Sequence, residues 1–205
     1  MKIFVVAGNY PIHNNNTEQA LLKQGEPVVF LKSDSSLLKA HKPFFVPTFM
    51  GKIDYGCHLA VRICRLGKTI SSRFAHRYYD ALTVGVDFTA SDMLAECRQK
   101  GLPWDVAKGF DGAAVIGDWV PKEKFLNVQA VHFGLCVNET STQSGCTSDM
   151  LTCIDDEIAY ISRFYTLKTG DILFTGAPSA DCQIHIEEHV TGFLEDRKVL
   201  DFRCK

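Results

Sequence analysis

The chain has 205 residues, of which 46% are hydrophobic and 22% charged, and its formal net charge is −2. This length and apolar content suffice for one domain with a full hydrophobic core. A nearly neutral chain without runs of like charge gives no electrostatic reason to expect nucleic acid or a membrane as partner. Small molecules and other proteins remain as partner classes.

The amino terminus and the cysteines bear on the compartment. The first apolar run, residues 3–7, is too short for a signal-peptide core and far too short to span a bilayer, which predicts a cytoplasmic protein. The eight cysteines include no Cys-x-x-Cys pair. We therefore expect buried, reduced thiols rather than a disulfide framework or a zinc site.

Four strands are expected in the first half of the chain, at residues 3–7, 27–32, 53–64 and 84–89. Alternation predicts that segment 53–64 is half-buried, with one polar face made by Asp54, Gly56, His58, Ala60 and Arg62. The segment 84–89 is apolar and carries Asp87. A carboxylate at a strand end, across from a strand that bears a histidine, is a common arrangement for a small metal or acid–base site.

Helices are expected at 71–80 and at 90–100, the second ending at Gly101. Thr147 and Ser148 are N-cap signals for the longest helix, whose apolar stripe reaches Tyr165. Between these helices, residues 128–137 alternate as a long strand and 138–144 form a polar turn. A buried strand at 172–174 and a hairpin across 190–202 complete the chain.

The strand motifs resemble the metal-binding core of the fumarylacetoacetate hydrolase family. The segment 55–61 is similar to the family's Tyr-Glu-x-Glu-Leu-Ala-Val, with Gly56 and His58 where the family has its two glutamates. The family's second motif is matched in full by Asp87, Thr89 and Asp92. Two of the three metal carboxylates of the family are therefore replaced here.

Further motifs occur in the family's order along nearly the whole chain. They are Asn9-Tyr10-x-x-His13, Phe30-Leu31-Lys32, the segment 107–111, the segment 143–150 and the segment 175–178. The resemblance implies an α+β fold, a mixed β-roll or β-sandwich with a few peripheral helices, and a single domain over residues 1–205. It also implies a homodimer.

The resemblance assigns roles to individual residues. It gives His13 to acid–base catalysis, although Asn16 stands where the family has the partner glutamate, and it gives Lys108 to stabilising negative charge on substrate oxygen. It implies substrate binding by Tyr10, Lys32, Gln143 and Thr175. The residues alone leave plainer alternatives open: a surface histidine at His13, a solvated strand-end lysine at Lys32, and a structural pairing of Lys108 with Asp111.

Divalent metal, Mg²⁺ or Mn²⁺, is the cofactor that the resemblance implies. Magnesium requires oxygen ligands, and Asp87 is the one carboxylate that remains of the three. Asp87 and His58 could form a weak site for a softer ion. The favoured expectation is that His58 fills the vacated space and forms a metal-free ion pair with Asp87.

Members of the family hydrolyse, decarboxylate or isomerise oxo-acids. The resemblance therefore implies a small oxo-acid or acylpyruvate-type substrate, with impaired or altered metal dependence. Two alternatives stay open: a non-catalytic relative that binds a small keto- or dicarboxylic acid, and a dimerisation partner of an intact relative.

Overall fold

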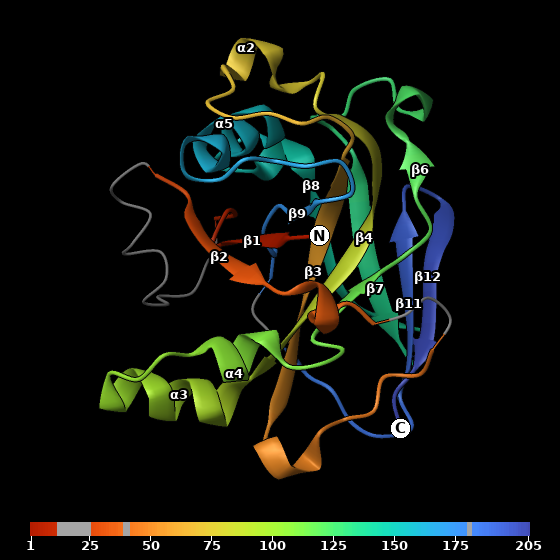
Figure 1. Cartoon of the computed structure of the whole chain (residues 1–205). Coiled ribbons are helices and arrows are strands. Elements are labelled where there is room, and N and C mark those ends of the chain that lie inside the picture. Colours follow the sequence, from red (N-terminus) through yellow and green to blue (C-terminus); the bar gives the residue numbers. More distant parts are fainter. Residues whose placement is uncertain (12–25, 39–41, 180–181) are drawn as a thin grey trace.

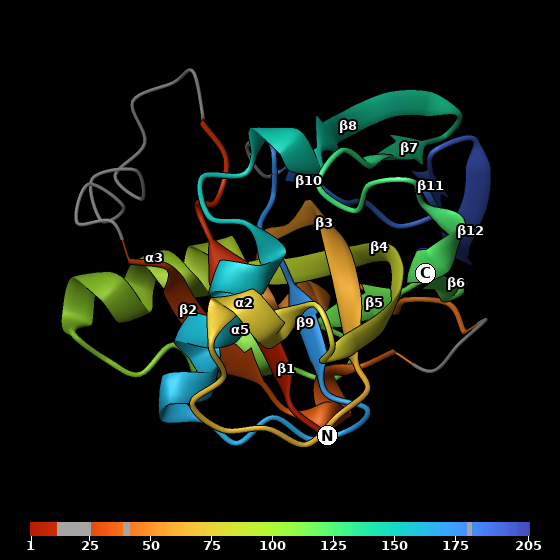
Figure 2. The same cartoon turned by 90° about the horizontal axis from the view of Figure 1, so that it is seen from above.

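Two β-sheets packed face to face form the body of the protein, and helices lie at its periphery (Figures 1 and 2). The structure, a computed structural model, describes residues 1–11, 26–38, 42–179 and 182–205. The larger sheet has eight strands, with the order β2-β1-β9-β3-β4-β5 and with β10 beside β3 and β6 beside β4. The smaller sheet has the order β12-β11-β7-β8. Mixed sheets with few helices confirm the expected α+β class.

The larger sheet contains all four strands expected in the first half of the chain. Its strands are β1 (Ile3–Ala7), β2 (Val28–Lys32), β3 (Ile53–Ile63), β4 (Tyr79–Ala90), β5 (Ala114–Ile116), β6 (Val120–Pro121), β9 (Ile172–Phe174) and β10 (Cys182–Gln183). Strand β4 is longer than predicted, and the helix expected at 71–80 is reduced to α2 (Ser72–Ala75). The reason is tertiary: Tyr79 and Leu82 pair with β3 and become buried, which outweighs the local helical pattern.

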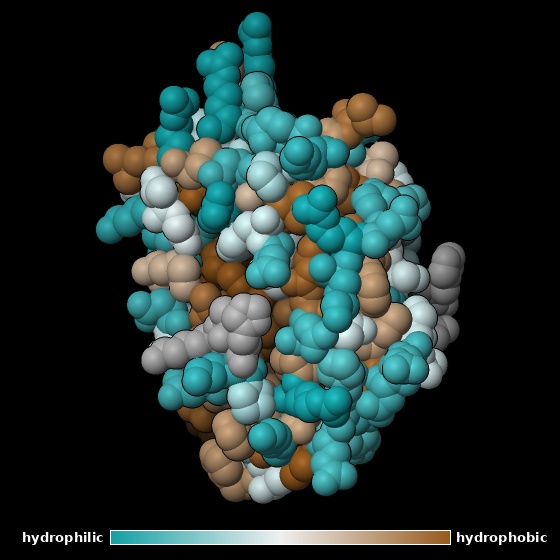
Figure 3. Space-filling model, turned by 90° about the vertical axis from the view of Figure 1, so that its right-hand side faces the viewer, coloured by the Kyte–Doolittle hydropathy of each residue, from teal (hydrophilic) through white to brown (hydrophobic). Residues whose placement is uncertain are grey.

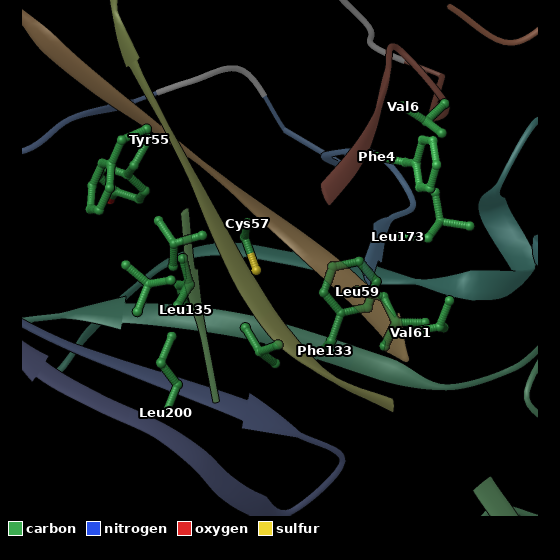
Figure 4. Close-up of a cluster of buried hydrophobic side chains, with 14 of the residues drawn as sticks. Phe4, Val6, Tyr55, Cys57, Leu59, Val61, Phe133, Leu135, Leu173 and Leu200 are labelled. Carbon is green, nitrogen blue, oxygen red and sulfur yellow. The ribbon is translucent and has the colours of Figure 1, made fainter. Parts of the chain in front are cut away.

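Both faces of β3 are buried, so the prediction of a half-buried strand was wrong. One face points into the main core between the sheets, where Cys57 and Leu59 lie near Phe133 and Leu135 of β7 (Figure 4). The other face is covered by a second cluster that includes Ala60 and residues of β1 and β9. Alternation assigned the faces correctly but could not show that the second face is covered as well.

The smaller sheet is built from two hairpins. Its strands are β7 (His132–Val137), β8 (Thr140–Cys146), β11 (His189–Leu194) and β12 (Arg197–Arg203). The polar turn predicted over 138–144 is confined to Asn138 and Glu139, which have φ values of 48° and 67°. The residues that follow form β8, an edge strand whose side chains are mostly exposed, which is why its sequence shows no apolar alternation. On the side of β11 and β12 the surface mixes polar and apolar residues (Figure 3).

The helices are α2, α3 (Ser91–Lys100), α4 (Asp105–Gly109) and α5 (Ile154–Phe164), with short 3-10 turns at Asp34–Ser36, Thr48–Met50, Lys122–Lys124 and Thr147–Asp149. Helix α3 ends at Gly101 with a φ of 65°, as expected. Helix α5 begins later than predicted, because the Thr147 hydroxyl donates to the Val128 carbonyl and accepts from the Val131 amide. The same two hydrogen bonds hold residues 128–131 in a loop, so β7 begins at His132 rather than at residue 128 as expected.

None of the eight cysteines forms a disulfide, and Cys57, Cys146 and Cys204 are buried. Within the described part of the chain, no helix combines the length and apolar character needed to cross a membrane.

Candidate active site

The register between β3 and β4 brings the candidate residues onto one face of the larger sheet. Gly56 lies opposite Asp87, and His58 lies opposite Gly85. In an antiparallel pair, residues directly opposite are in contact and diagonal neighbours lie roughly 7–8 Å apart. Side chains at positions 56 and 58 therefore flank Asp87, but the glycine at 56 contributes none.

Asp87 is a buried carboxylate held between two lysines. One of its oxygens, Oδ1, lies 2.5 Å from Lys32 Nζ, and the other, Oδ2, lies 3.3 Å from Lys108 Nζ. Burial by itself raises the pKa of this carboxyl, but the ammonium groups of Lys108 and Lys32 outweigh it and hold the pKa at about 2. Asp87 is therefore ionised throughout the physiological range.

Lys32 is fully buried, so the alternative of a solvated strand-end lysine is wrong. Its ammonium donates to the carbonyls of Phe88 and Ala113, both at 2.9 Å, in addition to Asp87. These acceptors match the three hydrogens of an ammonium group. Lys32 is thus held in place against Asp87 by three acceptors.

Lys108 extends from α4 toward the same carboxylate. Its Nζ donates to Thr89 Oγ1 at 2.7 Å and to Asp87 Oδ2 at 3.3 Å, and it lies 4.9 Å from the centroid of the Phe30 ring. The alternative pairing with Asp111 is therefore wrong. The side chain retains 13% exposure and lines a cavity, so a ligand there could contact its ammonium.

His58 lines the same cavity as a neutral imidazole. Its Nδ1 accepts a hydrogen bond from the Gly176 amide at 3.1 Å, which places the ring proton on Nε2. Burial lowers the pKa of His58 to about 4, although the Asp87 carboxylate acts in the opposite direction. The expected ion pair between His58 and Asp87 is wrong, because Asp87 faces two lysines and His58 carries no charge at neutral pH.

Gly176 makes this orientation of the histidine possible. Its φ is +113°, and a Cβ there would approach the Cβ of Asn9 to 2.6 Å. A side chain at this position is therefore excluded by conformation and by space. The amide of Gly176 was not predicted as a functional group, although the glycine lies within the Thr175–Pro178 motif.

Three of the predicted substrate-binding residues are buried and are not part of the cavity lining. Thr175 Oγ1 donates to the Leu59 carbonyl at 3.0 Å, and Gln143 accepts from the Cys57 amide at 2.6 Å. Tyr10 is 2% exposed, and its ring packs at 6.2 Å from Phe133. The contacts of Thr175 and Gln143 hold the backbone of β3 in place. The predicted catalytic His13 lies outside the described residues.

A cavity of about 760 Å³ opens beside these groups. Its polar side is formed by His58, Asp87, Thr89 and Lys108, with Ser91 and Arg98 on α3, and the remainder of the described wall is apolar. Among the described lining residues Lys108 and Arg98 are cations and Asp87 is the one carboxylate, so the described lining carries a net positive charge. Such a cavity favours an anionic ligand.

A divalent ion of the kind that the family uses does not fit the described residues. They contain no group of three or more His, Cys, Asp or Glu side chains that could hold a metal. The oxygens of Asp87 are engaged by ammonium groups, and Asp54, the other carboxylate on this strand face, lies 3.1 Å from Lys52 Nζ. Hard cations need several oxygen ligands, which this donor set does not supply.

Comparison with solved structures places the fold. It matches a protein of Yersinia pestis CO92 assigned to the fumarylacetoacetate hydrolase family with a TM-score of 0.89 and 30% identity, covering 100% of this chain and 92% of that chain. It also matches a fumarylpyruvate hydrolase of Pseudomonas aeruginosa, solved in complex with Mn²⁺ and pyruvate, with a TM-score of 0.88, 23% identity and coverage of 100% and 89%. Both are mixed-sheet proteins of the architecture described above.

Sequence comparison identifies the family. The model of the fumarylacetoacetate hydrolase C-terminal domain matches residues 2–205. The mitochondrial oxaloacetate tautomerase of Mus musculus is 30% identical over 203 residues, which cover 99% of this chain and 91% of that protein. This chain belongs to the fumarylacetoacetate hydrolase family.

Proposed function

We propose that the chain binds a small oxo-acid in this cavity without a divalent metal ion and promotes its keto–enol tautomerisation. The observation that carries the proposal is the pairing of two hydrogen-bond donors at the cavity wall. One is the ammonium of Lys108, and the other is Nε2–H of the neutral His58. Together they supply positive charge and a neutral donor where the family's glutamates would hold a metal.

The chemistry follows from charge development on the substrate oxygen. Enolisation moves a proton from the carbon next to the carbonyl to a base, and negative charge accumulates on the carbonyl oxygen. Donors held in position before the reaction stabilise that charge without reorganisation. Lys108 is fixed by Thr89 and Asp87, and His58 by the Gly176 amide, so both are preorganised. We assign the role of base to His13.

The four residues predicted to bind substrate are proposed to act indirectly, by holding the residues of the cavity in place. Lys32 fixes Asp87 from below, while Gln143 and Thr175 hold the backbone of β3 on both sides of His58. Tyr10 fills the core beside them. We therefore propose that Lys32, Gln143, Thr175 and Tyr10 support substrate binding by positioning the residues that contact the substrate.

A second candidate function is binding without turnover, and the loss of the two glutamates favours it. The two candidates differ in one experiment. Oxaloacetate and pyruvate are titrated calorimetrically into chelator-treated protein, and enol interconversion is followed by absorbance. Binding with turnover supports the tautomerase, binding alone supports the non-catalytic binding function, and absence of both contradicts the proposal.

We further propose that residues 1–205 act as one domain in a cytoplasmic homodimer. The match of a single family model to residues 2–205 supports the single domain. Light scattering measures the dimer: a mass of twice 22.9 kDa supports it, and a monomer mass contradicts it.

A further inference from the structure

The apolar wall of the cavity is not needed to bind the head of a small oxo-acid. Val28 and Phe30 of β2, Leu94 of α3 and Trp104 before α4 all line it, beyond the polar side formed by Lys108 and His58. Cavities of roughly 300–1,000 Å³ typically hold drug-sized ligands, so a ligand as small as pyruvate leaves most of this wall without a partner.

Two aromatic rings dominate this wall. The centroids of Phe30 and Trp104 are 5.8 Å apart, with an interplanar angle of 52°. Trp104 is 38% exposed and lines the cavity, so part of its side chain is accessible to a ligand. Aromatic rings in this tilted arrangement present both a face and an edge to a ligand.

The aromatic wall is joined directly to the polar side. The ammonium of Lys108 lies 4.9 Å from the centroid of the Phe30 ring, and the Lys108 amide donates to the Trp104 carbonyl at 3.2 Å. A ligand whose anionic head contacts Lys108 therefore has the faces of Phe30 and Trp104 within reach of its next atoms. Continuity between head site and aromatic wall is the main argument for a single ligand that uses both.

We infer that the preferred ligand is an α-oxo acid with an apolar, aromatic-sized substituent, whose head contacts Lys108 and His58 and whose tail packs against Phe30, Leu94 and Trp104. This inference rests on the proposed function and specifies its substrate class. Burial of a ring against this wall removes apolar surface from water on both partners. A carboxylate tail placed there would lose hydration without gaining a partner from these side chains.

A dicarboxylate is the competing ligand, because Arg98 also lines the cavity. Phenylpyruvate, pyruvate and oxaloacetate separate the possibilities, since they share the oxo-acid head and differ in the tail. Each is titrated calorimetrically into chelator-treated wild-type protein and into the variants Trp104→Ala and Trp104→Leu. Phe49→Ala is the matched control, since Phe49 is 87% exposed and does not line the cavity.

The expected result is that phenylpyruvate binds about tenfold more tightly than pyruvate or oxaloacetate. Trp104→Ala should remove most of this preference and leave pyruvate affinity within about twofold of wild type, while Phe49→Ala changes neither. Trp104→Leu should have a smaller effect of the same kind, and a melting curve establishes that each variant is folded.

Tighter binding of oxaloacetate than of phenylpyruvate would overturn the inference, as would equal weakening of all three ligands by Trp104→Ala. Failure of the proposed function gives a different pattern. In that case none of the three oxo-acids binds, or Lys108→Met leaves their affinities unchanged.

Discussion

The two faces of β3 differ in how far they follow the family pattern. The core face, with Tyr55, Cys57, Leu59 and Val61, packs in the cluster between the sheets, and alternation predicted that these residues share a face (Figure 4). The cavity face has lost both glutamates, at Gly56 and His58. Pairing with β4 nevertheless runs without interruption from Ile53 to Arg62. The fold therefore depends on the core face, while the chemistry on the cavity face can change independently.

The charge balance of the cavity face shows what that change requires. A lone buried carboxylate is costly unless it is paired. Asp87 is stabilised by Lys32 and Lys108, so the protein itself supplies the positive charge that a cation supplies to a three-carboxylate site.

Replacement of Lys32 by methionine should have the largest effect on stability. It leaves Asp87 buried with Lys108 as its remaining charged partner, and breaking a buried ion pair costs about 3–5 kcal/mol. Urea denaturation measures the free energy of unfolding. The exposed pair of Lys198 and Asp201 is the control, for which Lys198→Met should cost at most about 1 kcal/mol.

A Lys32→Met/Asp87→Leu double variant tests whether Asp87 is the main partner of Lys32. It should recover much of the lost stability, and no recovery would show that Asp87 is not the main partner.

His58 should make stability depend on pH. Its pKa is lowered to about 4 in the folded protein, against about 6.5 when unfolded. As the pH falls from 6.5 to 4, the unfolded chain takes up a proton and the folded protein does not, so the free energy of unfolding falls. The full loss is about 3 kcal/mol. Denaturation of wild type and His58→Asn across this range isolates the contribution, and identical pH profiles would contradict it.

Replacement of Lys108 by methionine should weaken oxo-acid binding about ten- to hundredfold, because hydrogen bonds to charged groups contribute about 1.5–3 kcal/mol. Calorimetric titration with oxaloacetate measures the loss. Lys100→Met is the matched control, since Lys100 is exposed and pairs with Glu96 on the surface of α3. Equal affinity in wild type and Lys108→Met would show that Lys108 does not contact the bound oxo-acid.

Restoring the glutamates in a Gly56→Glu/His58→Glu variant should raise Mg²⁺ affinity by about tenfold or more, because it returns two oxygen donors beside Asp87. Calorimetry with Mg²⁺ is the measurement. If the affinity does not rise, Asp87 stays paired with Lys32 and Lys108 and does not bind Mg²⁺.

Much of this architecture could be predicted from sequence, and the exceptions have a common cause. The segments of β3 and β4 and the placement of His58 near Asp87 follow from alternation and motif order. The partners of Lys32 do not, because the carbonyls of Phe88 and Ala113 lie 56 and 81 residues away in the chain. The Gly176 amide bonds the His58 ring 118 residues away, and the Thr147 hydroxyl bonds backbone groups 16 and 19 residues away, so the local pattern around these residues does not predict the contacts.

The most direct test of the account is oxo-acid binding in the presence and absence of metal. Oxaloacetate is titrated into protein that has been treated with a chelator, and the titration is repeated after addition of Mn²⁺. Binding through Lys108 and His58 without a metal predicts the same affinity in both titrations and a loss of affinity in Lys108→Met. Binding that disappears with the chelator and returns with Mn²⁺ would contradict it.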